Sequence, residues 1–400
     1  MEVNGITAAA VVVGGGPSGL MAAIALASAG IETALIARAA PADNRTTALL
    51  ASSVAALESL GAWNDCRSHA APLASLRIID ATRRLLRAPE VLFEAQEIGL
   101  EAFAWNIENR HLIAALEAKA AALKNLRRFA DQAVAVDVDD HNVTVRTEGG
   151  AVVTAKLAVG ADGKDSLCRK AADLAVRSHS YPQIALTYNV SHSRPHRDIS
   201  TEFHTESGPF TTVPLPGNRS SIVCVVSPAD AAAMQKLTGT DLNRELERRS
   251  HSILGKVEAE PGNGAFPLVM EIAEAFAANR IALVGEAAHR FPPIGAQGLN
   301  LGLRDAAAIA EIAAEYPDDP GQPDAMDRYT SERRADVMSR TVAVDLLNRS
   351  LLSGFLPMQG LRGIGLHLLG TVGPLRRAMM REGVMPRASQ PRLMRGEALS

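Results

Sequence analysis

The stretch AAAVVVGGGPSGLMAAIALASAGIETALIA, residues 8–37, decides the fold. A short apolar run leads into GGGPSG (14–19), and an alanine-rich segment with helical periodicity follows it. Pro17 is typical of a first helical turn, and Gly30 of a helix end. The next apolar run predicts a second strand, so the stretch predicts a strand–helix–strand unit with a glycine-rich turn before its helix.

The glycines of this turn have the spacing GxGxxG, which is typical of dinucleotide binding in this structural context. Gly14 permits a tight turn, Gly16 lets the backbone approach a pyrophosphate, and Gly19 allows the helix to pack closely on the strand. Free N–H groups and the positive end of the helix dipole favour phosphates at this position. The turn therefore predicts a dinucleotide site.

The end of the second strand departs from the usual pattern, in which an acidic residue binds the adenosine ribose. Ala37 occupies that place, and Arg38 follows it. Arg38 contacts the adenosine side of the ligand in one interpretation and is a solvated arginine in the other.

Two further glycine-centred segments follow apolar runs. In LAVGADGKDS (157–166), Asp162 and Gly163 form either a common turn or part of a cofactor site. In GEAAHRFPPIGAQGLNLGLRD (285–305), two prolines stiffen a loop that enters a helix, so the N–H groups at its start could bind an anion. The alternative is an ordinary strand–loop–helix corner. Together the three sites predict a long ligand with a pyrophosphate and a ring system, the shape of FAD.

Bulk composition excludes several classes of protein. The chain has 400 residues, 47% of them hydrophobic, and a net charge of −3, so nucleic acid is not an expected partner. No uninterrupted apolar stretch approaches the about 18 residues of a membrane span, and the N-terminus lacks the basic region of a signal peptide. Three scattered cysteines and the histidine spacing predict no disulfide and no metal, which fits a cytoplasmic protein.

The remaining elements are predicted from periodicity and turn residues. Helices are expected at 45–61, 109–123 and 228–250, strands at 75–93, a β-meander at 134–163 and a second sheet at 183–227. In that sheet, Tyr188, Phe203 and Phe210 either line a substrate site or belong to the core. The predicted domains are a FAD-binding domain (1–75, 101–175 and 271–344), an inserted substrate domain (76–100 and 176–270) and a C-terminal helical region (345–400).

The C-terminal region 345–400 is apolar, glycine-broken and basic. It contains eight arginines, no lysine and three acidic residues, a net charge of +5. It either caps the core or rests on an anionic membrane surface, and the two interpretations are compatible.

The whole chain resembles the flavoprotein aromatic hydroxylases of the para-hydroxybenzoate hydroxylase-like family, and within it the ubiquinone-biosynthesis branch. The resemblance lies in GGGPSG (14–19), DNRTTALLASSVAALESLGAW (43–63), NIENRHLIAAL (106–116), GADGKDSLCR (160–169), the segment 285–305 and the tail LLNRSLLSGFLPMQGLRGIGLHLL (346–369). It implies an α/β fold, with a Rossmann-like FAD-binding domain, an inserted and mainly antiparallel β-sheet substrate domain, and a C-terminal helical segment.

The resemblance also assigns roles to individual positions. The FAD pyrophosphate would be bound by Gly14, Gly16 and Gly19, and FAD would also be contacted by Arg45 and Arg110. Both FAD and the nicotinamide cofactor would be contacted by Asp162 and Gly163. The ribityl and pyrophosphate part would face Gly285 and Glu286, and the isoalloxazine ring would be lined by Pro293, Gly298, Leu299 and Asn300. Three positions depart from the family pattern. Ala37 stands where the family has Glu, Glu286 where it has Asp, and Ala296 where it has Gly.

The implied reaction is hydroxylation of an aromatic ring by O₂ through a flavin hydroperoxide, with NAD(P)H as transient reductant. The implied substrate is a polyprenylated phenol of ubiquinone biosynthesis, and other proteins of that pathway are expected partners at the inner face of the membrane. Gly298, Leu299 and Asn300 are the predicted catalytic contacts, acting through electrostatics. His289 packs beside the cofactor or acts as a base. Alternatives are a hydroxylase of a small soluble aromatic, a prenyl reductase, and a weakly FAD-binding, non-catalytic member of a complex.

Overall fold

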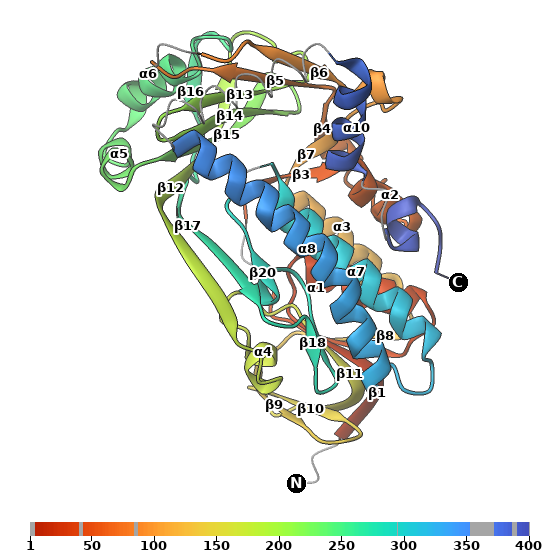
Figure 1. Ribbon diagram of the computed structural model, residues 1–400. Coiled ribbons are helices and arrows are strands. Elements are labelled where there is room, and N and C mark those ends of the chain that lie inside the picture. Colours follow the sequence, from red (N-terminus) through yellow and green to blue (C-terminus); the bar gives the residue numbers. More distant parts are fainter. Residues whose placement is uncertain are drawn as a thin grey trace.

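The computed structural model describes residues 5–39, 43–83, 87–293, 295–352, 372–385 and 390–399. In this part of the chain three sheets and a group of packed helices form a mixed α/β structure (Figure 1). The eight-stranded sheet consists of β1 Gly5–Val13, β2 Thr33–Ile36, β8 Leu126–Phe129, β9 Ala133–Val138, β10 Val143–Thr147, β11 Val152–Gly160, β18 Ala277–Ala278 and β19 Ile281–Leu283.

The centre of this sheet is parallel, in the order β19-β11-β1-β2-β8. The predicted βαβ unit is confirmed, because α1 (Pro17–Ser28) connects the parallel strands β1 and β2. The predicted meander is confirmed as the antiparallel run β9-β10-β11.

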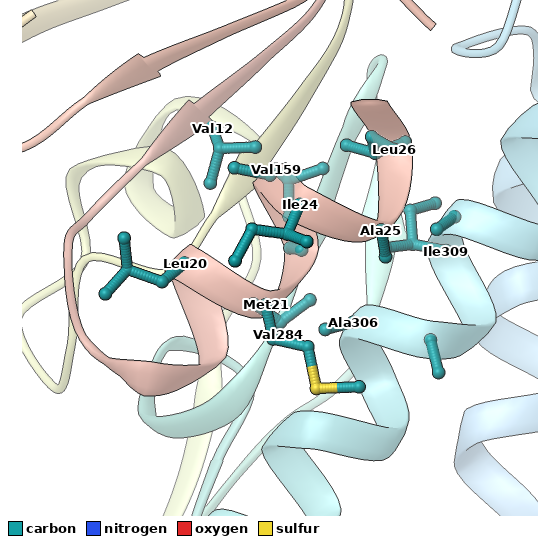
Figure 2. Packing of buried hydrophobic residues seen from close by; sticks show 14 of the residues in the cluster. Val12, Leu20, Met21, Ile24, Ala25, Leu26, Val159, Val284, Ala306 and Ile309 are labelled. Atoms are coloured by element: carbon teal, nitrogen blue, oxygen red, sulfur yellow. The ribbon is translucent and has the colours of Figure 1, made fainter. Parts of the chain in front are cut away.

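Helix α1 is buried along most of its length, although it is only twelve residues long. All residues from Gly19 to Ala27 are buried, because the sheet covers one side and α7 (Gln297–Glu315) covers the other. Figure 2 shows Met21 and Ala25 of α1 beside Ala306 and Ile309 of α7. Small side chains on both helices allow this close packing.

The nine-stranded sheet consists of β5 Ser75–Asp80, β6 Val91–Glu94, β12 Val176–His192, β13 Ile199–Thr205, β14 Gly208–Leu215, β15 Arg219–Val226, β16 Val257–Ala259, β17 Gly264–Ala273 and β20 His289–Arg290. Its pairings are antiparallel except for β5 with β13. The predicted strands at 183–227 are confirmed, and so are the helices that follow them, α5 Pro228–Met234 and α6 Gly239–Arg249. Tyr188, Phe203 and Phe210 lie in a core cluster with residues of these helices, which agrees with the core interpretation. Tyr188 in addition lines a cavity, so for this residue the substrate interpretation stays a prediction.

The third sheet has three strands, in the order β3 Thr46–Leu50, β7 Ala104–Glu108 and β4 Ala70–Leu73. Along the chain these strands alternate with strands of the two larger sheets. The prediction of a helix over 45–61 is wrong for its first part. Residues 46–50 pair antiparallel with β7, and α2 spans only Ala51–Ser59. The β-branched Thr46 and Thr47 favour the strand, and the pairing with β7 outweighs the helical periodicity. Helix α3, Asn109–Ala122, agrees with the predicted 109–123.

The C-terminal part contains α8 (Pro323–Leu352), α10 (Gly373–Val384) and a 3₁₀ turn at Arg392–Arg395. Further short elements are α4 Leu167–Ala171 and the 3₁₀ turns Arg67–His69, Ala95–Ile98 and Gly285–Ala287. Helix α8 runs along α7 and on to the nine-stranded sheet (Figure 1). There Asp345 accepts a hydrogen bond from the Tyr181 hydroxyl at 2.7 Å, and the Asn348 amide donates to Gln183 at 3.0 Å. Most of the tail that resembles the ubiquinone branch, 353–369, lies outside the described residues.

Candidate functional site

A groove with a volume of about 750 Å³ lies where β1 and β2 end, a size typical of ligand sites. It is lined by Val13, Gly14, Gly15, Gly16, Pro17, Ile36, Ala37, Arg38, Ala39, Asp43, Arg45, Ile113, Asp131, Gln132, Ala133, Asp162, Asp165 and Leu167. Five residues with predicted cofactor roles therefore share one groove, although they come from four separate segments of the chain. They are Gly14, Gly16, Arg38, Arg45 and Asp162.

The glycine turn fits a pyrophosphate. A Cβ atom on Gly14, whose φ is +118°, would lie 2.2 Å from the Ala161 carbonyl oxygen, and one on Gly19 would lie 2.1 Å from the Gly14 carbonyl oxygen. A Cβ atom on Gly16 would meet nothing within 4 Å. Gly16 is also the N-cap of α1 and provides no capping side chain. Gly14 and Gly19 are thus required by packing, whereas Gly16 leaves the helix N–H groups accessible to a ligand.

The Asp162 carboxylate already has hydrogen-bond partners within the protein. Its carboxylate accepts hydrogen bonds from the Ser166 hydroxyl at 2.5 Å and from the N–H groups of Leu167 and Cys168 at 2.7 and 3.0 Å. It therefore holds the start of α4 against the groove. Gly163, with φ +80°, forms the turn after it. Their roles toward the two cofactors stay predictions.

Arg45 lies at the junction of two cavities. It lines the large groove and also a second cavity of about 230 Å³ beneath the nine-stranded sheet. Its guanidinium pairs with Asp43 at 2.8 Å and lies over the Phe266 ring, 5.6 Å from the centroid. The hydrogen bond with Asp43 raises the pKa of Arg45, and burial opposes this effect more weakly. The second cavity is lined by Asn44, Arg45, Thr46, Thr187, Tyr188, Asn189, Ser221, Ile222, Val223, Gly262, Phe266, Pro267, Val269, Glu286, Arg290, Phe291, Pro292 and Pro293.

Arg110 lies at the start of α3 and pairs with Glu108 at 3.0 Å. Asp43 receives hydrogen bonds from Arg45 and from the Asn109 amide, so it connects the two segments that carry the predicted arginines. Sequence reasoning missed Asp43 as a groove residue. Its position two residues before Arg45, in the quoted segment 43–63, was the available signal.

The loop after β19 joins the two large sheets. Gly285 has φ +59°, Glu286 is exposed and faces the second cavity, and His289 begins the short strand that pairs with β17. His289 is fully buried, and its Nε2 lies 2.6 Å from an oxygen of Asp305 on α7. His289 is thus packed inside the protein, and its predicted place beside the cofactor stays a prediction.

The Asp305 carboxylate interacts with several hydrogen-bond donors of the loop and of α8. Besides His289, it accepts bonds from the Gly285 N–H at 3.1 Å and from the Arg333 guanidinium of α8 at 2.7 Å. Burial raises the pKa of Asp305, but the interactions with His289 and Arg333 and the hydrogen bonds from His289 and Gly285 together outweigh burial, and the net shift is downward. The ionised carboxylate therefore fastens the loop to α7 and α8.

The start of α7 combines free N–H groups with an unusual residue. Ala296, the N-cap, has the left-handed values φ 53° and ψ 30°, which explains why glycine is typical of the family at this position. Gly298 and Leu299 lie in the first helical turn, where backbone N–H groups have no partner within the helix. Neither residue lines the two cavities described above, and their predicted role as electrostatic contacts stays a prediction.

The Asn300 side chain is used within the protein. Its oxygen accepts bonds from the Leu50 N–H at 2.9 Å and the Ser53 hydroxyl at 2.7 Å. Its nitrogen donates to the carbonyl oxygens of Ala48 and Ala296 at 2.8 and 2.6 Å. Asn300 thus holds α7 on the β3–α2 corner, a positioning role that sequence reasoning did not identify. A direct contact with the ligand stays a prediction.

A glycine turn at the ends of parallel strands lines one groove, residues of an antiparallel sheet line a second cavity, and Arg45 lines both. This arrangement is that of a dinucleotide-binding protein with two sheet layers. Residues 7–343 match the family described as FAD binding domain, and the chain belongs to this family. The predictions of FAD as cofactor and of the resemblance to ubiquinone hydroxylases are confirmed by the comparisons.

Two relatives are similar over nearly the whole chain. The ubiquinone hydroxylase UbiL of Rhodospirillum rubrum is 32% identical over 402 residues, which cover 97% of this chain and 92% of the relative. The 3-demethoxyubiquinol 3-hydroxylase of Escherichia coli is 30% identical, and the match covers 92% of this chain and 96% of the relative. The fold resembles that of the p-nitrophenol 4-monooxygenase PnpA from Pseudomonas putida, with a TM-score of 0.78, 19% identity and coverage of 96% and 100% of the two chains. The predicted fold class is confirmed.

We expect Gly16→Val to fold normally and to lose FAD during purification. The new side chain finds open space in the protein but covers the N–H groups that would hold the pyrophosphate. The absorbance ratio of flavin to protein and the melting temperature measure the two effects. Gly5→Val is the matched control, because a Cβ there also meets nothing within 4 Å but lies at the far end of β1. A Gly16→Val protein that remains yellow would contradict the assignment.

We expect Asn300→Asp to lower the free energy of unfolding. The carbonyl oxygens of Ala48 and Ala296 would lose their donor and face an anion, at a cost of about 1–3 kcal/mol for each buried group. Urea unfolding measures the loss. Asn243→Asp is the control. Its carboxylate retains the oxygen that accepts a hydrogen bond from the Ala259 N–H, so the free energy of unfolding should change little. Equal stability of the two variants would show that the Asn300 contacts do not hold α7.

Proposed function

We propose that the protein is an FAD-dependent monooxygenase that hydroxylates the ring of a polyprenylated phenol on the route to ubiquinone. The observation that carries the proposal is the match of nearly the whole chain to two ubiquinone-ring hydroxylases. It is supported by the geometry, since a dinucleotide groove opens at Arg45 toward a second cavity.

The second cavity suits an aromatic ring. Ile222, Val223, Phe266, Phe291 and Val269 give it apolar walls, and backbone and polar groups are interspersed among them. Its volume of about 230 Å³ is below the range of about 300–1,000 Å³ that is typical of drug-sized ligands. A ring fits this space, and a polyprenyl tail would leave it.

FAD, when bound, supplies the electron transfer and the oxygen chemistry. The chain itself provides orientation, exclusion of water and electrostatics. The first-turn N–H groups of Gly298 and Leu299 would stabilise negative charge, an effect of about 0.3–1 kcal/mol, or up to about 2 in partly buried geometry. Asn300 and Asp305 keep that helix start in place through the bonds described above. We further propose NADH or NADPH as the transient reductant, and O₂ as the co-substrate.

The C-terminal half of α8, together with the whole of α10, would rest on a membrane surface. No described helix is long and apolar enough to cross a bilayer. Met338, Val342 and Leu346 are exposed on α8 at four-residue spacing, and Leu375 and Met379 are exposed on α10. Arg377 and Arg381 on α10 add positive charge that favours anionic lipids. Contacts with other ubiquinone-biosynthesis proteins stay a prediction.

Oxygen labelling tests the reaction. With ¹⁸O₂, NAD(P)H and a polyprenylated phenol in detergent micelles, one labelled atom should enter the ring, as mass spectrometry of the product would show. The Gly16→Val variant is the matched control and should give no labelled product. Hydrogenation of the tail without label would indicate a prenyl reductase. Labelling of a small phenol alone would indicate a soluble aromatic substrate. A colourless protein that stays colourless with added FAD would indicate a non-catalytic relative.

Flotation with liposomes tests the membrane contact. We expect the double variant Val342→Glu and Leu346→Glu to lower the bound fraction by about tenfold, because two charges would enter the lipid interface. Val134→Glu is the control, since Val134 is also exposed (52%, against 61% for Val342 and Leu346) but lies on β9, far along the chain from α8. Undiminished flotation of the double variant would contradict the contact.

A further inference from the structure

The adenosine end of the groove lacks the usual acid at the end of β2. Ala37 occupies its place and is almost fully buried, and its N–H donates to the Phe129 carbonyl of β8 at 3.0 Å. A ribose at this end of the groove would need acceptors from another element.

The neighbouring strand provides an acid at the equivalent edge. In the parallel pair of β2 and β8, Ile36 lies opposite Phe129. Adjacent strands are about 4.8 Å apart. Asp131, two residues beyond Phe129, therefore lies beside the end of β2, and it lines the same groove as Ala37.

The Asp131 carboxylate is held in a fixed orientation. One oxygen accepts from the Gln132 N–H at 2.7 Å, and the other accepts from the Gly149 N–H at 2.9 Å. A hydrogen bond from Thr147 and these backbone bonds lower the pKa of Asp131, so it is ionised at neutral pH. A carboxylate has about four acceptor positions, so it retains capacity for a ligand.

The turn between β10 and β11 supports this end of the groove through bonds to two of its lining residues. Glu148 pairs with Arg38, and Gly149 donates to Asp131, so the turn joins the residues that follow β2 to those that follow β8. Arg38 thus lies on the groove wall as an ion-pair partner.

We propose that Asp131 replaces the acid that is missing at Ala37 and accepts hydrogen bonds from the ribose hydroxyls of the adenosine half of FAD. The inference rests on FAD as the cofactor in the proposed function. It makes Asp131 a cofactor-binding residue that acts on the nucleotide and not on the flavin ring.

The test compares FAD with FMN, which lacks the adenosine half, on the apoprotein of the full chain. We expect Asp131→Asn to weaken FAD binding by about tenfold or more, as for loss of a charged hydrogen-bond acceptor, and to leave FMN binding unchanged. Quenching of flavin fluorescence measures both affinities. Asp137→Asn is the control, because Asp137 is an exposed acid on β9 that pairs with Arg146 and is absent from the groove wall.

A second experiment measures the affinity for an FAD analogue whose adenosine ribose has no hydroxyls. The native protein should bind it about tenfold more weakly than FAD, whereas the Asp131→Asn protein should bind both equally. Unchanged FAD binding by Asp131→Asn, or an equal loss of FAD and FMN, would overturn the proposal. A native protein that binds neither flavin would overturn the proposed function itself, which is a separate result.

Discussion

The close approach of three backbones around Ser18 is the constraint on which the site depends. A Cβ atom on Gly302 of α7 would lie 2.3 Å from the Ser18 hydroxyl oxygen and 3.0 Å from the Gly285 Cα. Only glycine allows α1, the loop after β19 and α7 to approach so closely. The N-terminal parts of α1 and α7 are therefore fixed relative to each other, as the proposed binding of one long ligand requires.

The charges buried beneath this contact maintain the geometry. Arg333 bonds to Asp305 and Asp336, and Arg304 bonds to Asp336, with all four side chains nearly excluded from water. Buried ion pairs contribute little net stability, because desolvation offsets their attraction. Their partners must nevertheless be in position, since an unpaired buried charge is costly. The network therefore specifies one arrangement of α7, α8 and the loop.

The parts of the site that local spacing encodes could be predicted from the sequence. The turn at Gly14–Gly19 and the start of the helix near Gly298 need only neighbouring residues for their conformation, and both appear in the structure where expected. The contacts that depend on tertiary pairing could not be predicted. Asn300 bonds to residues about 250 positions away, and the relation of Asp131 to Ala37 follows only from the register of β2 and β8. The strand at Thr46–Leu50 was missed for the same reason, because its partner is β7.

Helix α8 has a consequence for how the molecule unfolds. Its first half is tied to Asp305 through Arg333, and its second half is tied to the nine-stranded sheet through Asp345 and Tyr181. One helix thus stabilises both layers, and the strands of each layer come from interleaved parts of the chain. Loss of the nine-stranded sheet would remove the partners of Asp345 and Asn348 on α8. The two layers have separate cores, and α8 is the element through which the unfolding of one layer would remove contacts from the other.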